Sequence, residues 1–114
     1  MFFEPVNIRT LAQQVIDLFK SHAMNKNIEL NLTIAPNVPE FIVADIVRLK
    51  QILVNLIGNA VKFTNFGEVL LQIEEIKNVK NKFTTLRFSV IDTGIGIKEE
   101  NLNKIFQSFV QEDV

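Results

Sequence analysis

Two asparagines stand one helical turn apart in an otherwise apolar segment, RLKQILVNLIGNAVKFT, at residues 48–64. Asparagine is roughly 0.6 kcal/mol worse than alanine inside a helix, because its side chain competes for backbone hydrogen bonds. Amide oxygens such as those of Asn55 and Asn59 can ligate a hard cation like Mg²⁺, and the nearby Lys62 can meet a phosphate. The types and spacing of these three side chains therefore fit a site for a metal-bound phosphate. They fit the solvated edge of an amphipathic helix equally well.

The helix that must position these side chains is predicted to begin after an Asp45 N-cap and to run to about Phe63. At 100° per residue, five of its polar side chains fall within about 40° of one line. This polar row consists of Arg48, Gln51, Asn55, Asn59 and Lys62. Nearly every other position is apolar, which is typical of a buried helix. Gly58 lies beside the polar row, where its missing side chain leaves room for another group.

A second candidate site follows a predicted strand, in FSVIDTGIGI at residues 88–97. Gly94 and Gly96 allow a positive φ and a close approach of the backbone to a ligand. The carboxylate of Asp92 can accept a hydrogen bond from an exocyclic amine, which adenine has at the position where guanine has a carbonyl. An ordinary strand-to-helix turn, with Asp92 capping its own loop, is the competing interpretation. The segment matches neither the dinucleotide-binding glycine pattern nor a P-loop.

The remaining pattern predicts the elements around these two segments. Apolar periodicity indicates a helix over residues 7–27 with Asn7 as its N-cap, and strict alternation indicates a strand over 28–34. A short strand at 41–43, a hairpin of strands at 67–76 and 82–91, and a helix at 98–109 follow. This order predicts an α+β fold, a two-layer sandwich with helices on one face of a mostly antiparallel sheet.

Composition narrows the classes of function. The chain has 114 residues, 47% of them hydrophobic, with a net charge of −1 and no cysteine. These values indicate one globular domain, argue against a nucleic-acid partner held by electrostatics, and exclude disulfides and thiolate metal sites. No apolar run approaches the roughly 20 residues that span a bilayer. We therefore expect a cytoplasmic domain, and the residues leave open whether a parent protein is membrane-anchored.

Taken in order, DIVRLKQILVNLIGNAVKFT, VIDTGIGI and IFQSFVQED resemble the ATP-binding catalytic domain of sensor histidine kinases. That domain belongs to the superfamily shared with gyrase, the heat-shock chaperone ATPases and the mismatch-repair ATPases. The resemblance implies a Bergerat-type ATPase fold over residues 1–114, in which FEPVNIRTLAQQVIDLF, residues 3–19, is the first helix.

The resemblance also implies roles for the residues of the first segment. Asn59 would coordinate the Mg²⁺ that bridges the phosphates of ATP, and Asn55 would line the same site. Lys62 would approach phosphate as a catalytic residue together with Asn55. Phe63 would pack near the nucleotide.

For the later segments the resemblance implies that Asp92 binds the adenine amino group and that Gly94 and Gly96 shape its pocket. Phe106 and Phe109 match a phenylalanine motif that anchors a mobile lid over ATP. Two core phenylalanines on a short helix would give the same pattern.

Asn55 discriminates between activities within the superfamily. The hydrolytic ATPases generally carry a glutamate at the matching position, as the base for the attacking water, and an amide cannot accept that proton. The resemblance therefore implies phosphoryl transfer to a histidine on a separate dimerisation domain, with a response regulator downstream. A hydrolytic ATPase and a nucleotide-free interaction module are the alternatives.

Two departures from the family pattern lead to further expectations. The sequence ends at QEDV, before the second glycine motif and the closing elements, so we expect a partial domain that binds nucleotide weakly, is inactive alone, and self-associates through uncovered apolar surface. The sole histidine, His22, lacks the acidic neighbour and downstream proline of the family's phosphoacceptor. We expect His22 to be a surface residue.

Overall fold

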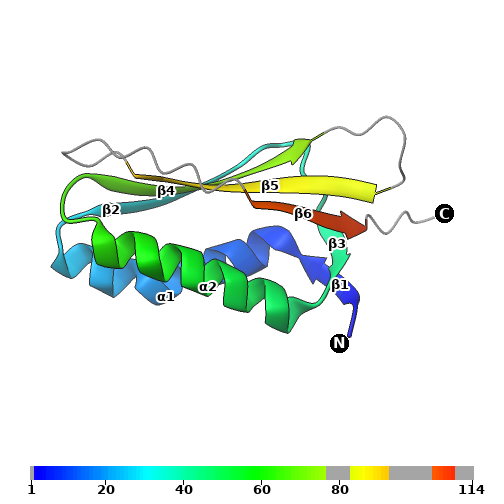
Figure 1. The fold of residues 1–114 in the computed structure, drawn as a ribbon, viewed down its shortest axis with the longest axis horizontal. Coiled ribbons are helices and arrows are strands. Elements are labelled where there is room, and N and C mark those ends of the chain that lie inside the picture. The colour runs from blue at the N-terminus through cyan, green and yellow to red at the C-terminus, as the bar shows by residue number, and fades with distance from the viewer. Residues whose placement is uncertain (1, 77–82, 93–103, 110–114) are drawn as a thin grey trace.

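Two helices cover one face of a mixed sheet in the computed structural model, which describes residues 2–76, 83–92 and 104–109 (Figure 1). The elements in chain order are β1 (Glu4–Asn7), α1 (Ile8–Asn25), β2 (Glu29–Ile34), β3 (Phe41–Ala44), α2 (Ile46–Phe63), β4 (Glu68–Ile76), β5 (Phe83–Asp92) and β6 (Lys104–Phe109). The predicted α+β sandwich is confirmed. Within the described residues, neither helix is long and apolar enough to cross a membrane.

The sheet has the strand order β1-β3-β6-β5-β4-β2. Among the described strands only β2 and β4 pair in parallel, and the other neighbours are antiparallel. The predicted hairpin is confirmed, because β4 pairs with β5 from Val69 opposite Asp92 to Ile76 opposite Thr85. Both helices begin at the β1–β3 end of the sheet and run in the same direction, so their C-terminal ends lie side by side (Figure 1).

Both predicted N-caps are confirmed. The Asn7 side chain accepts a hydrogen bond from the Thr10 N–H at 3.1 Å, and the Asp45 carboxylate accepts one from the Arg48 N–H at 3.3 Å. Each cap satisfies one of the amide groups that the first turn of a helix leaves without a partner. The two helices therefore start where their sequences predict.

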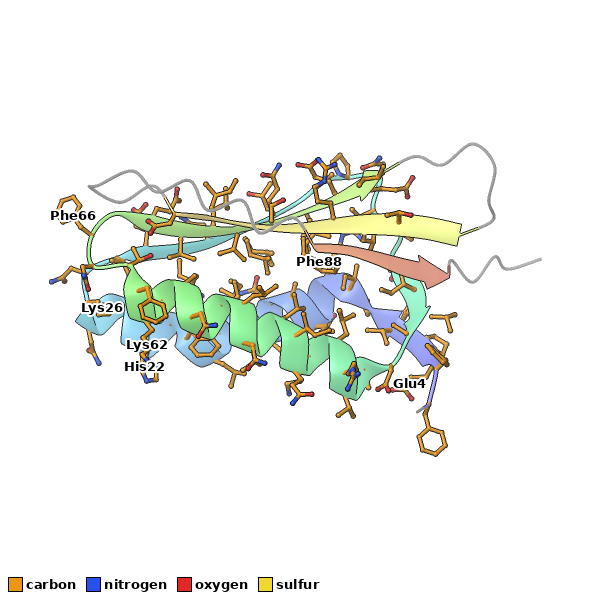
Figure 2. The ribbon with its side chains drawn as sticks, in the orientation of Figure 1. Glu4, His22, Lys26, Lys62, Phe66 and Phe88 are labelled. Atoms are coloured by element: carbon orange, nitrogen blue, oxygen red, sulfur yellow. The ribbon has the colours of Figure 1, made fainter. Side chains whose placement is uncertain are left out.

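The core lies between the helices and the sheet. Alternation along β4 and β5 turns Val69, Leu71, Ile73, Leu86, Phe88 and Val90 toward the helices, and all six are buried. Figure 2 shows Phe88 in this layer. The helices bury Leu11, Ala12, Val15 and Ile16 from α1 and Leu49, Leu53, Leu56, Ile57 and Val61 from α2. This packing holds α2 in the core from Leu49 to Val61.

The chain start differs from what the resemblance implied, because residues 4–7 form β1 instead of the first turn of a helix. Asn7 is the N-cap that starts the helix, and its backbone has an extended conformation, so the residues before it continue as a strand. The strand pairs with β3 from Glu4 opposite Ala44 to Asn7 opposite Phe41. The helix begins at Ile8, five residues later than the resemblance implied.

The last element also differs from its prediction. Residues 104–109 form β6, where a helix over 98–109 was expected, and residues 98–103 lie outside the described residues. The β6 backbone pairs with β5 from Phe83 opposite Phe109 to Phe88 opposite Lys104. A short helix is marginal in isolation, whereas the edge of β5 offers a row of backbone partners. The predicted helix is therefore wrong for the half that the structure describes.

Candidate functional site

The polar row of α2 faces solvent. Its members Arg48, Gln51, Asn55, Asn59 and Lys62 are all exposed, while the opposite side of the helix is buried in the core. The row therefore lies on the surface of the helix layer, with the two amides at its centre. A ligand can reach it without any change in the core.

Charge on α2 is entirely positive. The helix from Ile46 to Phe63 carries Arg48, Lys50 and Lys62, and it contains no aspartate or glutamate. Among the described residues, no group of three His, Cys, Asp or Glu side chains is placed to hold a metal ion. The chemistry of this face therefore suits an anion, and a cation here needs an anionic ligand to accompany it.

The end of α2 is joined to the end of β5 by a partly buried hydrogen bond. Thr64, which is 2% exposed, donates from Oγ1 to Oδ2 of Asp92 at 2.8 Å. The Thr64 N–H bonds the Ala60 carbonyl at 3.0 Å and closes the helix. Asp92 is the last residue of β5 and lies opposite Val69 of β4. The two segments predicted to form a site thus meet at Thr64 and Asp92.

Thr64 was not singled out as a site residue from the sequence. A threonine directly after a helix carries no local signal of such a role. Thr64 becomes part of the candidate site only through its hydrogen bond to Asp92, which is 28 residues away along the chain.

An exposed aromatic side chain lies next to this junction. Phe63 is 72% exposed, and Nζ of Lys62 stands 5.4 Å from the centroid of its ring. Phe66 is also exposed on the turn that leads into β4. Phe63 and Phe66, which flank Thr64 in the sequence, therefore each offer exposed apolar surface on which a planar ligand can pack.

Lys26 holds the C-terminal end of α2 to the end of α1. Its Nζ donates to the carbonyl of Val61 at 2.7 Å and to that of Lys62 at 2.9 Å. Figure 2 shows Lys26, Lys62 and His22 at the same end of the helix pair. His22 is exposed in the last turn of α1, as expected for a surface residue.

Gly58 makes room for another side chain of the protein. A Cβ at this position would lie 3.2 Å from Cζ and 3.4 Å from Cε1 of Phe19. The ring of Phe19 from α1 therefore fills the space that the glycine leaves. Phe19 and Gly58 also line an open groove of about 450 Å³ between the C-terminal halves of the helices.

Four residues singled out in the sequence are not placed as parts of the site. Gly94 and Gly96 lie outside the described residues. Phe106 and Phe109 belong to β6, of which the structure describes the backbone alone. Their roles stay predictions.

Comparison with known families decides the class of the domain. The family model of histidine kinase-, DNA gyrase B- and HSP90-like ATPases matches residues 44–114. The chain belongs to this family. The matched range holds α2, the β4–β5 hairpin and Asp92, so it contains both halves of the candidate site.

Individual relatives place the chain among the histidine kinases of this family. The peroxide stress-activated histidine kinase mak2 of Schizosaccharomyces pombe is 37% identical over 99% of this chain and 5% of that protein. The signal transduction histidine-protein kinase BarA of Escherichia coli K12 is 36% identical over 96% of this chain and 12% of that protein. This histidine kinase catalytic domain thus spans a small part of the relatives that it matches.

A solved structure agrees with this assignment. Full-length ShkA in complex with AMPPNP is 41% identical and superposes with a TM-score of 0.70 over 82% of this chain and 19% of that chain. The fold of the histidine kinase catalytic domain and the sequence motifs therefore support the same family.

Proposed function

We propose that this chain is the ATP-binding catalytic domain of a two-component sensor histidine kinase, which presents the γ-phosphoryl group of Mg²⁺-bound ATP to a histidine on a separate dimerisation domain. The observation that carries the proposal is the hydrogen bond between Thr64 and Asp92, because it joins the end of the amide-bearing helix to the carboxylate assigned to adenine. A response regulator would then receive the phosphoryl group from that histidine.

The phosphate end of the proposed site lies on α2. Asn59 and Asn55 present exposed amides one turn apart, and Lys62 follows within one further turn. Asn59 would hold Mg²⁺ through its amide oxygen, Asn55 would line the same site, and Lys62 would meet phosphate oxygens. Bound Mg²⁺ would supply charge neutralisation at the transferring phosphoryl group. The absence of acidic residues on α2 suits this task, since a carboxylate would repel the phosphates.

The base end of the proposed site is the junction of α2 and β5. Asp92 would accept a hydrogen bond from the exocyclic amine of adenine, and the exposed ring of Phe63 would pack against the nucleotide. Gly94 and Gly96, directly after Asp92 along the chain, would shape the wall of the pocket. The nucleotide would thus extend from the end of β5 across the outer face of α2.

The proposed reaction is phosphoryl transfer because the site lacks a base for water at Asn55. An amide cannot take a proton from an attacking water at neutral pH. Catalysis would therefore rest on positioning and on the charges of Lys62 and the bound cation. His22 lies at the end of α1 as an exposed residue, and the acceptor histidine would come from another domain.

The test is a calorimetric titration of the chain with AMPPNP in the presence of Mg²⁺. We expect binding that is at least about tenfold weaker in Asp92→Ala and unchanged in Glu40→Ala, a control that removes an exposed carboxylate far from the junction along the chain. In Asn59→Ala, we expect the remaining affinity to become independent of Mg²⁺.

Two results would contradict the proposal. Absence of binding by the unchanged chain, or equal binding by Asp92→Ala, would remove the assignment of a nucleotide site. Steady hydrolysis of ATP that falls in Asn55→Ala would replace a kinase with a hydrolytic ATPase.

A further inference from the structure

We infer that Thr64 is a positioning residue, whose hydroxyl holds the carboxylate of Asp92 in the orientation that selects a 6-aminopurine over a 6-oxopurine. The inference rests on the proposed function, since it concerns how the same site recognises the base. Neither the family match nor the relatives assign this role to Thr64.

The backbone of Thr64 leaves its side chain little freedom. Its N–H is bonded to the Ala60 carbonyl at 3.0 Å, and its φ of −91° and ψ of 122° turn the chain out of the helix. A β-branched side chain is stiff about χ1, and here it is almost completely buried. The hydroxyl is therefore a fixed donor at the end of α2.

The partner of Thr64 belongs to the sheet, as the last residue of β5. Asp92 is paired with Val69 at the start of the β4–β5 hairpin. The turn before β4 is itself fixed, because Gly67 has a φ of 99° and its carbonyl accepts the Glu29 N–H at 2.9 Å. The last torsion of an aspartate side chain, which sets its carboxylate plane, is broad and roughly two-fold. The 2.8 Å bond from Thr64 restrains that torsion.

The orientation of this carboxylate decides which purine it accepts. Adenine presents an amino group at position 6, which donates to a carboxylate, whereas guanine presents a carbonyl oxygen there, which a carboxylate repels. A carboxylate free to turn can instead accept from the N1–H and 2-amino groups of guanine. A held carboxylate therefore discriminates between the bases, and a released one discriminates less.

A purely structural role for Thr64 makes a different prediction. If the hydroxyl only ties α2 to β5, its removal loosens the whole site and weakens ATP and GTP analogues in parallel. If it orients Asp92, its removal changes the ratio of the two affinities. The ratio therefore separates the two roles.

The experiment is a calorimetric titration of the chain, with Mg²⁺, against AMPPNP and GMPPNP. Thr64→Val removes the hydroxyl at nearly constant volume, Thr64→Ala removes it with less steric demand, and Thr64→Ser keeps it. We expect the preference for AMPPNP over GMPPNP to fall about tenfold or more in the Val and Ala variants, as the loss of a hydrogen bond to a charged group implies. Thr64→Ser should stay within about threefold of the unchanged chain.

A double-mutant cycle locates the effect. In an Asp92→Asn background, Thr64→Val should change the base preference no further, because the oriented carboxylate is already gone. Circular dichroism identifies the variants that fold, and either folded variant without the hydroxyl suffices for the test.

Three outcomes would overturn the inference, and they are distinguishable. If AMPPNP and GMPPNP weaken in parallel, or if neither affinity changes, Thr64 does not set the preference, while the proposed nucleotide site stands. If Thr64→Val still shifts the preference in the Asp92→Asn background, it does not act through Asp92. If the unchanged chain binds neither analogue, the proposed function fails together with the inference.

Discussion

Replacement of Lys26 by methionine should loosen the end of α2 that carries Lys62 and Thr64. The ammonium group of Lys26 donates to two carbonyls in the last turn of that helix, at 2.7 Å and 2.9 Å. Methionine keeps most of the unbranched aliphatic stem and removes the charge and its donors. The substitution therefore isolates the hydrogen bonds from the packing of the stem.

The magnitude follows from these two contacts. A hydrogen bond that involves a charged group contributes about 1.5–3 kcal/mol when it is well shielded. Lys26 is only partly buried, so water can solvate both its ammonium group and the released carbonyls. We therefore expect a loss of about 1–2 kcal/mol in the free energy of unfolding. For a chain of 114 residues this corresponds to a fall in Tm of about 4–8 °C.

The assay is urea unfolding followed by circular dichroism, with Lys20→Met as the matched control. Lys20 lies in α1, the helix that Lys26 caps, its side chain is 58% exposed, and it forms an ion pair with Asp17 at 3.6 Å. We expect the control to lose no more than about 0.5 kcal/mol. Amide exchange should also show faster opening of the Thr64 N–H in Lys26→Met, because that group closes the last turn. Equal stability of Lys26→Met and the unchanged chain, or equal losses in both variants, would refute the reasoning.

Two further substitutions test the packing of α2. Gly58→Ala should change the free energy of unfolding by no more than about 1 kcal/mol, because the gain in helix propensity offsets a shift of the Phe19 ring, whose Cζ would lie 3.2 Å from the new Cβ. Urea unfolding that shows a loss above about 2 kcal/mol would mean that Phe19 cannot move into the groove that it lines. Leu53→Ala should lose about 2–5 kcal/mol because the side chain is 0% exposed, whereas Leu18→Ala, at 55% exposed, should stay within about 0.5 kcal/mol. Similar losses in the two leucine variants, measured in the same way, would contradict the assigned core.

Elements that are specified locally could be predicted from the sequence. Each helix has apolar periodicity and an N-cap, Asn7 for α1 and Asp45 for α2. In each helix the cap directly precedes the periodic residues, so both signals can be read from one short stretch of the chain. By contrast, β1 has four residues, of which only Val6 is buried, and it is stabilised by pairing with β3 more than 30 residues later. Its sequence alone carries too little signal, because the stabilising partner is distant in the chain.

The same distinction holds for the candidate site. The row of Asn55, Asn59 and Lys62 was predicted because residues on one helix have fixed relative angles. The bond from Thr64 to Asp92 depends on the registers of β4 and β5, which no local pattern specifies. The proximity of Gly58 to Phe19 likewise depends on how α1 packs against α2, and hence on two helices at once.

The parallel course of α1 and α2 has an electrostatic consequence (Figure 1). The peptide dipoles of a helix sum to about half a negative charge at its C-terminus, so two C-termini side by side concentrate about one negative charge. Lys26 and Lys62 lie at this end (Figure 2) and oppose that charge. A positive charge at this end therefore stabilises the two helix termini. The proposed contact of Lys62 with phosphate uses a positive charge at the same place. A neutral residue in place of either lysine should leave the negative ends of the helix dipoles less well balanced and should also weaken the attraction of an anion. Added salt should reduce both electrostatic effects.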